Sequence, residues 1–342
     1  MLVVSDGFEV TVTDENGIYY LPSAKEHGYV FISVPGNYEV PYVNNLPQFF
    51  HRLSPGSTVE RKDFSLVKSD NTDHVVIAMA DWHLAGRNND LEQFRSGFLV
   101  DVNKTIADYK AAGKKVYGLT LGDMSWETYW YDNKFALPEY LMEMYKINCP
   151  IFNVMGNHDN DPYFQGDWLS EQTYKRLVGP SYYAFNLGDV HYIVLDNIDY
   201  INTGGSQGVS GSRNYNTTIV QRQREWLRKY LATIEDKSKP VVIGMHAPLY
   251  NRPQVDANGN YQKSFYLSGG STLVSDLSEF TNVHILTGHS HVNYTVDGTS
   301  SIMEHNIGAV CATWWWTGRN GYAGNHIGKD GSPGGYAVWE MN

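Results

Sequence analysis

The sequence has few cysteines, no cluster of positive charge and no long apolar run. With only Cys149 and Cys311, one disulfide is possible but cannot be inferred, and a free buried thiol is the simpler interpretation of Cys149. The net charge of −11, without a run of Lys or Arg, argues against a nucleic-acid groove, because phosphate backbones are held by clustered cations. No window of 18 consecutive apolar residues occurs, so no transmembrane segment is predicted.

The first part of the chain is rich in short strand patterns. Residues 1–70 contain alternating runs, such as residues 9–13 and 29–34, that are separated by Gly, Asp and Pro. This pattern predicts a small β-sandwich. The stretch has no cluster of His, Asp or Glu suited to chemistry, so we expect it to serve as a platform, a spacer or a contact surface.

From Val75 onward, short apolar runs alternate with amphipathic segments, which predicts an α/β domain. The predicted buried strands cover residues 75–80, 116–121, 151–155, 241–245 and 283–286, and a hairpin is predicted from residues 181–185 and 191–195. Helices are predicted over residues 91–112, 137–147 and 217–234. The polar stretches 202–216 and 251–270 are predicted to be long loops, which in a compact domain are usually functional or mobile.

Polar motifs directly follow the five predicted buried strands. They are Asp81-Trp82-His83, Gly122-Asp123, Gly156-Asn157-His158-Asp159, His246 and Gly288-His289-Ser290-His291. Ligand sites of open α/β sheets form beyond the carboxyl ends of the strands, where neighbouring loops converge. The motifs are therefore expected to point into one crevice. Each motif alone is weak, because a lone His is more often structural, but their order and their positions after apolar strands make the set specific.

The side chains expected in this crevice are four imidazoles, two carboxylates and one amide. They belong to His83, His246, His289, His291, Asp81, Asp123 and Asn157. Imidazole and oxygen ligands suit two transition-metal ions such as Zn, Fe, Mn or Co. A carboxylate can bridge two metals, and Asp123 is the best candidate because it lies between the two ligand groups in chain order.

These motifs, in this order, resemble the signature of calcineurin-like metallophosphoesterases over roughly residues 73–308. The resemblance implies an α/β fold of four layers, in which two facing mixed β-sheets are flanked by helices. It also implies two divalent or trivalent transition-metal ions (Mn, Fe or Zn). One ion would be held by Asp81, His83, Asp123 and His291, and the other by Asp123, Asn157, His246 and His289.

The same resemblance assigns catalytic roles within the third motif. His158 matches the family's catalytic histidine, which is not a metal ligand, and Asp159 would orient it. The expected reaction is hydrolysis of a phosphate ester by a metal-activated hydroxide, with His158 as the general acid. The expected partner is a phosphorylated small molecule or another phosphoester substrate.

Other functions stay open at this point. A phosphodiesterase, a nucleotidase or a sugar-phosphate phosphatase could use the same site, because a fold does not determine its substrate. A surface binding protein with an inert metal domain is a further alternative, although a degenerate enzyme usually loses a ligand and all seven are present here.

Aromatic residues after the Gly122-Asp123 motif give a hint about the leaving group. Trp126, Tyr129, Trp130 and Tyr131 could stack on a sugar, base or aryl group, or could pack under the helix predicted from residue 137. The three consecutive tryptophans at residues 314–316 are more typical of a packing ridge between domains than of a ligand platform.

The ends of the chain resemble accessory segments of bacterial exported members of this family. Residues 3–19 look like a carboxypeptidase-regulatory or prealbumin-like β module entered partway through, and residues 314–336 resemble a junction into a further β domain. We therefore predict a module at residues 1–70 that is trimmed at its start, a catalytic domain at residues 71–308, and a C-terminal segment at residues 309–342 that leads into a truncated domain. An exported, periplasmic or cell-surface protein is expected, with any signal peptide upstream of this chain.

Overall fold

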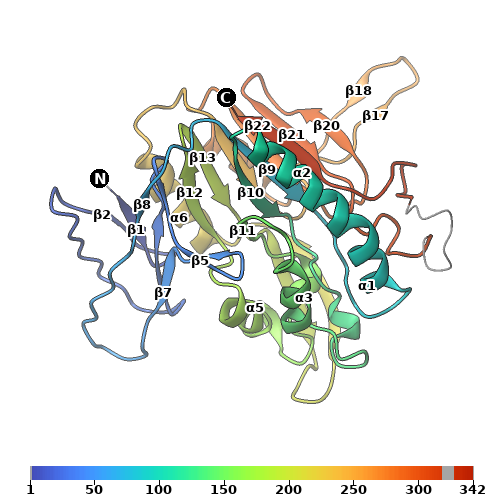
Figure 1. Ribbon diagram of the computed structural model, residues 1–342, viewed down its shortest axis with the longest axis horizontal. Helices are drawn as coiled ribbons and strands as arrows, with labels where there is room; N and C mark the ends of the chain where they lie inside the picture. The colour runs from blue at the N-terminus through green and yellow to red at the C-terminus, as the bar shows by residue number, and fades with distance from the viewer. Residues whose placement is uncertain (1, 318–326, 342) are drawn as a thin grey trace.

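Two large β-sheets that lie face to face, with helices on their outer sides, form the centre of the protein (Figure 1). The computed structural model describes residues 2–317 and 327–341, so residues 318–326 of the predicted C-terminal segment lie outside it. This arrangement is the mixed α/β fold with flanking helices that the sequence predicts.

The first sheet has the strand order β11-β10-β9-β22. Its strands β9 (His74–Met79), β10 (Lys115–Thr120) and β11 (Ile151–Phe152) are parallel, and β22 (Ala337–Met341) pairs with β9 in the antiparallel sense. Every residue of β9 is buried, which explains its continuous apolar run. Because β22 lies beyond residue 308, part of the predicted C-terminal segment completes this sheet, and the domain boundary at 308 stays a prediction.

The second sheet has the strand order β12-β13-β16-β19-β21-β20. Its inner strands β13 (Val190–Val194), β16 (Val241–Gly244), β19 (Val283–Thr287) and β21 (Ile302–Asn306) are parallel. The strands β12 (Tyr183–Leu187) and β20 (Tyr294–Asp297) are its antiparallel edges. The hairpin predicted near residue 188 is thus present as β12 and β13.

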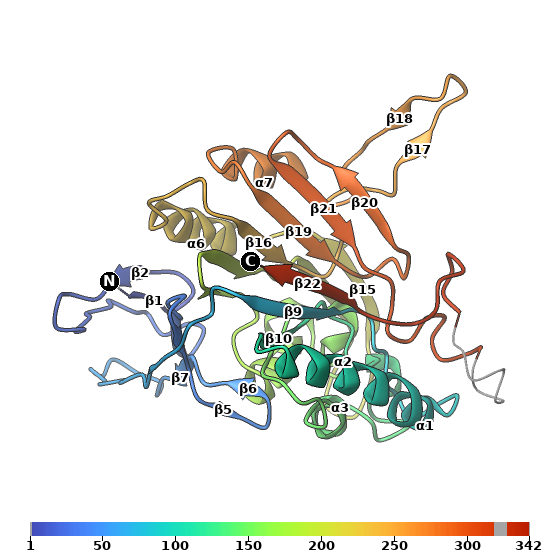
Figure 2. The same ribbon diagram turned by 45° about the horizontal axis from the view of Figure 1, so that its top comes forward.

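Helices cover the outer faces of both sheets (Figure 2). On the side of the first sheet lie α1 (Asp90–Gln93), the π-helical turn η1 (Phe94–Phe98), α2 (Leu99–Ala111) and α3 (Leu137–Met144). On the side of the second lie α6 (Gln221–Ala232) and α7 (Gly270–Asp276). Val75 and Ile77 pack toward the first group of helices, whereas Val76 and Ala78 belong to the core that includes the second sheet, as the alternation of a strand requires.

Short strands dominate residues 1–70. The strands β1 (Val3–Ser5), β2 (Val10–Val12), β3 (Tyr29–Ser33) and β7 (Phe50–Arg52) form an antiparallel sheet of order β2-β1-β3-β7. Two further pairs are β4 (Tyr38–Glu39) with β8 (Val67–Lys68), and β5 (Tyr42–Val43) with β6 (Leu46–Pro47). This strand-rich region shares one hydrophobic core with the second sheet, and the Asn186 amide N–H donates to the Val34 carbonyl at 2.9 Å.

Both predicted long loops contain hairpins. Residues 202–216 overlap a hairpin of β14 (Ile198–Thr203) and β15 (Ser212–Thr217), so the helix predicted from residue 217 begins only at Gln221. Residues 251–270 contain β17 (Gln254–Val255) and β18 (Tyr261–Gln262). Asn214 and Asn216 of β15 are poor strand formers, so the pairing with β14 comes from tertiary context that the local pattern does not reveal.

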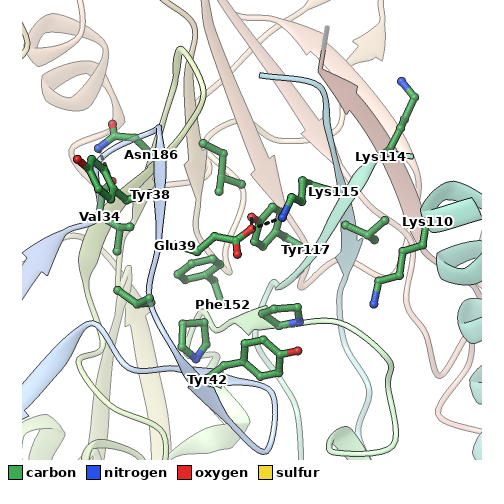
Figure 3. Close-up of a pocket in the computed structure, with 15 residues that line it drawn as sticks. Val34, Tyr38, Glu39, Tyr42, Lys110, Lys114, Lys115, Tyr117, Phe152 and Asn186 are labelled. Carbon is green, nitrogen blue, oxygen red and sulfur yellow. Dashed lines mark hydrogen bonds and ion pairs between the residues drawn. The ribbon is translucent and has the colours of Figure 1, made fainter. Parts of the chain in front are cut away.

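A pocket of about 220 Å³ lies at the seam between the N-terminal strands and the first sheet (Figure 3). Glu39 inside it accepts hydrogen bonds from the Tyr117 hydroxyl at 2.7 Å and from Lys115 Nζ at 3.0 Å. These two donors lie at or near the amino end of β10, whereas the polar motifs follow the carboxyl ends of the strands. The pocket is therefore separate from the site described next.

Candidate functional site

The five polar motifs meet at the carboxyl ends of β9, β10, β11, β16 and β19. The structure brings together the side chains of all seven residues that the sequence places in one crevice. All but His289, which is partly exposed, are buried. The remaining short helices of this region are η2 (Glu127–Tyr129), η3 (Asn157–Asp159), α4 (Gly166–Ser170) and α5 (Gln172–Leu177).

One group of ligand-type atoms faces a common point on the side of β9. Nε2 of His83 lies 3.0 Å from Nε2 of His291 and 3.5 Å from Oδ2 of Asp123. Oδ1 of Asp81 lies 3.4 Å from Nε2 of His291 and 3.8 Å from Nε2 of His83. Donor atoms at these pairwise separations can share a cation placed between them.

A second group surrounds Nε2 of His246. This atom lies 3.0 Å from Oδ1 of Asn157, 3.1 Å from Nδ1 of His289 and 3.2 Å from Oδ2 of Asp123. Oδ2 of Asp123 is therefore the atom that belongs to both groups. This position is the one a bridging carboxylate requires.

In each imidazole of the site, one ring nitrogen faces the other ligand-type atoms. In all but His83, the second ring nitrogen contacts a hydrogen-bonding group elsewhere in the protein. Nδ1 of His246 lies 2.7 Å from the Leu121 carbonyl, and Nδ1 of His291 lies 3.1 Å from the Ala312 carbonyl. Carbonyl oxygens only accept, so these two Nδ1 atoms carry protons, and Nε2 is the nitrogen that faces the other ligand-type atoms. Burial would lower the pKa of both rings, but the carboxylates of Asp123 and Asp81 outweigh burial and raise the pKa of His246 to about 9 and that of His291 well above its usual range. A cation bound here would displace the second proton of each ring. Nε2 of His289 lies 2.9 Å from the Tyr266 hydroxyl, which leaves Nδ1 facing His246.

The backbone of the site is unusual because five of the seven residues have left-handed conformations. The φ values are 54° for Asp81, 44° for His83, 52° for Asp123, 67° for His289 and 58° for His291. Each such residue costs of order 1–3 kcal/mol, and the surrounding structure must compensate. Strain of this kind, concentrated on residues with chemical side chains, is typical of functional sites.

Glycines in the motifs allow the loops to approach each other. Gly122 has φ 85°, and a Cβ atom added to it would lie 2.5 Å from Nδ1 of His246. A Cβ atom on Gly288 would lie 2.7 Å from Oδ2 of Asp81. Larger residues at these positions would push the loops apart, so the glycine of each motif is needed for the convergence of the side chains.

The site fits cations because one of its ligand-type atoms is not satisfied within the protein. Oδ1 of Asp81 is buried and has no hydrogen-bond partner within the described residues. Burial lowers the pKa of His83 to about 4 and that of His289 to about 3, so both rings are neutral at pH 7 and offer lone pairs. Burial alone would raise the pKa of Asp123, but His246 and its other imidazole neighbours hold that pKa well below its usual range.

Glu127 is a functional-site residue that the sequence motifs do not reveal. Its Oε2 atom contacts Nδ1 of His158, and Glu127 is itself buried. Burial would lower the pKa of His158, but the charges of Glu127 and Asp123 outweigh burial and raise it to about 9. In the sequence, Glu127 is distinguished only by its position four residues after the metal-ligand candidate Asp123. That spacing is too common to identify a functional residue.

Asp159, predicted to orient His158, makes different contacts. Its carboxylate accepts hydrogen bonds from the backbone N–H groups of Met124 at 2.9 Å, Ser125 at 3.2 Å and Gly156 at 2.8 Å. The carboxylate that contacts the ring of His158 is thus Glu127. Consecutive side chains of the short helix η3 point in different directions, so Asp159 ties the two loops together while His158 faces the site.

Of the aromatic residues after Asp123, some pack within the protein and one lies at the site. Trp130 is 3% exposed and donates its indole N–H to Ser125, and Tyr131 stacks on Tyr163 with ring centroids 3.5 Å apart. Trp126, by contrast, is half-buried against the rings of His83 and His158.

The two cysteines are buried and unpaired. The sulfur of Cys311 lies 3.8 Å from Nδ1 of His291 and within 4.8 Å of a ring nitrogen of His83. Cys311 therefore packs against imidazoles of the site. Its position could not be inferred from the sequence, because it is brought there by the chain that follows β21.

Comparison with known protein families identifies the class of enzyme to which this protein belongs. A family described as "Calcineurin-like phosphoesterase" matches residues 74–293, and "N terminal of Calcineurin-like phosphoesterase" matches residues 1–69. With two facing sheets and a convergent His/Asp site at their strand ends, the protein is a metal-dependent phosphoesterase. The match covers more than half of the sequence, and the chain belongs to the calcineurin-like phosphoesterase family.

Solved structures with the same fold are distant in sequence. A dimetal phosphatase from Danio rerio is 14% identical, with a TM-score of 0.51, and the match covers 79% of this chain and 99% of that one. A structure of PhoD is 13% identical, with a TM-score of 0.51, and the match covers 92% of this chain and 69% of that one. No curated protein is similar enough to this chain to count as a match. Among the described helices, none is long and apolar enough to cross a membrane.

Proposed function

We propose that this phosphoesterase hydrolyses a phosphate ester with two bound transition-metal ions and with His158 as the general acid. The ions would be Mn, Fe or Zn. Asp81, His83, Asp123 and His291 would hold one ion, and Asp123, Asn157, His246 and His289 the other. The observation that carries the proposal is that Oδ2 of Asp123 belongs to both groups of facing donor atoms.

The charges of the proposed ligands suit a phosphate ester. When bound, the two ions supply positive charge for the phosphoryl oxygens and lower the pKa of a coordinated water. With the ions bound, Asp81 and Asp123 would be the only charged residues among the seven, because Asn157 is neutral and an imidazole that binds a metal is neutral too. Two carboxylates against two divalent cations leave the site with about two net positive charges, which attracts an anionic phosphoester.

His158 and Glu127 are placed to handle the proton of the leaving group. The ring of His158 contacts Glu127 through Nδ1, so Nε2 is the nitrogen available to a substrate. The backbone N–H of His158 donates to Oδ1 of Asp123 at 2.8 Å, which ties the acid to the bridging candidate. We propose that Glu127 takes the orienting role that the family resemblance assigns to Asp159, and that His158 donates a proton to the departing alkoxide.

Removing the charge of Glu127 is expected to weaken this proton transfer. Glu127→Gln should lower turnover of esters with alkyl leaving groups by about 10- to 100-fold, because an unoriented His158 protonates a basic alkoxide poorly. The 4-nitrophenolate leaving group needs less protonation than an alkoxide, so turnover of 4-nitrophenyl esters should fall less. The measurement is kcat for both ester types with metal content unchanged, and the control is Glu139→Gln at the start of α3. Equal losses for both ester types would argue against an acid role.

Loss of the Tyr266 hydroxyl is expected to weaken metal binding. Tyr266→Phe removes the nearer of two hydroxyls at Nε2 of His289, which lies 2.9 Å away, and leaves that of Tyr215 at 3.4 Å, so the ring is held less firmly toward His246. Groups that orient a ligand in this way are worth about 10- to 100-fold in metal affinity. Titration of apo protein with Mn²⁺ or Zn²⁺ measures the change for one of the two ions. Tyr261→Phe, at an exposed tyrosine of β18, is the matched control, and an affinity equal to that of the wild type would remove the role.

A substrate panel tests the proposed function itself. Purified protein, stripped of metal and reloaded with Mn²⁺, should hydrolyse phosphate esters, and metal-free protein should not. Monoesters and diesters of the same alcohol, compared side by side, distinguish a phosphatase from a phosphodiesterase, and nucleotides and sugar phosphates complete the panel. No metal-dependent hydrolysis of any ester would overturn the proposal and favour a binding role.

We also propose that the protein is exported and that residues 1–70 form an accessory module. The support is the likeness of this region to modules of exported members of the family. Fractionation of cells that express the full-length gene product tests the location. Recovery with the cytoplasmic fraction would contradict it.

A further inference from the structure

Two half-buried tryptophans lie over one half of the candidate metal centre. The ring centroid of Trp126 is 5.3 Å from that of His83 and 5.6 Å from that of His158. The ring centroid of Trp314 is 4.7 Å from that of His291. The two indole rings lie side by side, with centroids 6.2 Å apart and an interplanar angle of 31°. We call this pair the tryptophan wall.

The two tryptophans of the wall are more exposed to solvent than the tryptophans that fill the hydrophobic cores. Trp82, Trp226 and Trp315 are at most 1% exposed and fill the two cores. Trp126 and Trp314 are instead only partly buried, and each contacts a ligand-type imidazole. Backbone conformation does not set Trp314 apart, because buried Trp315 has φ 60° and Trp314 has φ 47°. Incomplete burial next to the imidazoles is therefore the feature that distinguishes the wall.

Cations hold the two rings in place. The guanidinium carbon of Arg87 lies 5.1 Å from the ring centroid of Trp126 and 4.6 Å from that of Tyr129, whose hydroxyl also accepts a hydrogen bond from Arg87. Nζ of Lys329 lies 4.6 Å from the ring centroid of Trp314. Because these contacts restrain the rings before any substrate binds, little conformational freedom is lost on stacking.

The wall also lies where a leaving group must be. A group that takes a proton from His158 lies next to that ring, and Trp126 is in contact with the same ring. On the basis of the proposed function, we infer that the tryptophan wall stacks against the leaving group. The preferred substrates are then phosphate esters of alcohols that carry a flat aromatic ring, such as arylalkyl or nucleoside esters.

Benzyl phosphate and cyclohexylmethyl phosphate test this inference with matched leaving-group chemistry. Both release a primary alcohol of similar size, and only the first has an aromatic face. The wild type should have a kcat/KM about tenfold higher for benzyl phosphate, and Trp126→Leu and Trp314→Leu should each remove most of this preference. Trp126→Phe should retain most of it. Trp316→Ala, at an exposed neighbour in the same segment, is the control and should not change it. The ratio of kcat/KM for a nucleoside 5′-monophosphate to that for glycerol phosphate can be compared with the ratio for the benzyl and cyclohexylmethyl esters. The larger ratio shows whether a nucleobase or a simple aryl ring is the better ligand.

A binding measurement separates failure of the inference from failure of the proposed function. Benzylphosphonate should bind Mn²⁺-loaded wild type about tenfold more tightly than cyclohexylmethylphosphonate, and this ratio should fall toward one in the Leu variants. Hydrolysis of both esters with equal kcat/KM, or a ratio unchanged by the Leu variants at unchanged metal content, would overturn the inference. If no ester is hydrolysed, the proposed function fails, and the phosphonate ratio alone decides whether the wall binds aromatic groups.

Discussion

Asp123→Asn is expected to reduce bound metal from about two ions to at most about one per chain and to reduce phosphoesterase activity to the background rate. Oδ2 of Asp123 lies 3.5 Å from Nε2 of His83 and 3.2 Å from Nε2 of His246, so it is the one carboxylate oxygen that faces both groups of donors. Asparagine keeps the size of the side chain but removes its charge. It also adopts the left-handed φ of 52° at a lower cost than alanine does, so Asp123→Ala is expected to lose stability as well.

Elemental analysis of purified protein after dialysis checks this result. Asp161→Asn is a suitable control, because Asp161 is buried and hydrogen-bonded to Tyr131 but is not part of the site. It should keep both metals and most of the activity. Two ions per chain in Asp123→Asn, at the affinity of the wild type, would contradict the bridging assignment.

His158→Ala is expected to have the opposite pattern: metal content stays at the level of the wild type, whereas turnover falls by about 10²- to 10⁴-fold. The side chain of His158 contacts Glu127, and its backbone N–H donates to Oδ1 of Asp123. A ring nitrogen of His158 also lies within 4.8 Å of ligand-type atoms of His83 and Asp123, so the metal content of this variant separates an acid from a ligand. The fall should be largest for alkyl esters, whose leaving alkoxides need the proton most.

The comparison that tests this prediction is kcat for alkyl and 4-nitrophenyl phosphates at saturating metal. His51→Ala, at a histidine of β7 in the N-terminal strands, controls for loss of an imidazole elsewhere. Near-unchanged turnover of alkyl esters by His158→Ala would remove the general-acid role. Loss of metal in this variant would instead make His158 a ligand.

The sequence pattern was sufficient to predict an α/β domain and the convergence of the site, for a physical reason, whereas the two facing sheets were implied by the family resemblance. The strands that carry the motifs are buried on both faces, so they appear as apolar runs of the right length, and polar residues that directly follow them must lie at one edge of the sheets. Glycines such as Gly122 and Gly288 mark the turns where backbones approach closely. These features are local, and local features can be read from one sequence.

Contacts between separate loops could not be predicted in this way. Glu127 meets His158, Tyr266 meets His289, and Cys311 packs against His291, and none of the three follows a regular spacing from its partner. The hairpin of β14 and β15 was likewise hidden by its polar composition. Asp159 is adjacent to His158 in sequence, but it caps backbone N–H groups instead, because adjacent residues of a tight turn diverge.

The proposed chemistry requires two cations that share Asp123 at the ends of the facing sheets. A crystal structure of Mn²⁺-loaded protein, with anomalous scattering recorded at the manganese edge, would locate them. We expect two anomalous peaks, one among Asp81, His83 and His291 and one among Asn157, His246 and His289, with Asp123 in contact with both. A single peak, or peaks away from these side chains, would rule out a shared Asp123.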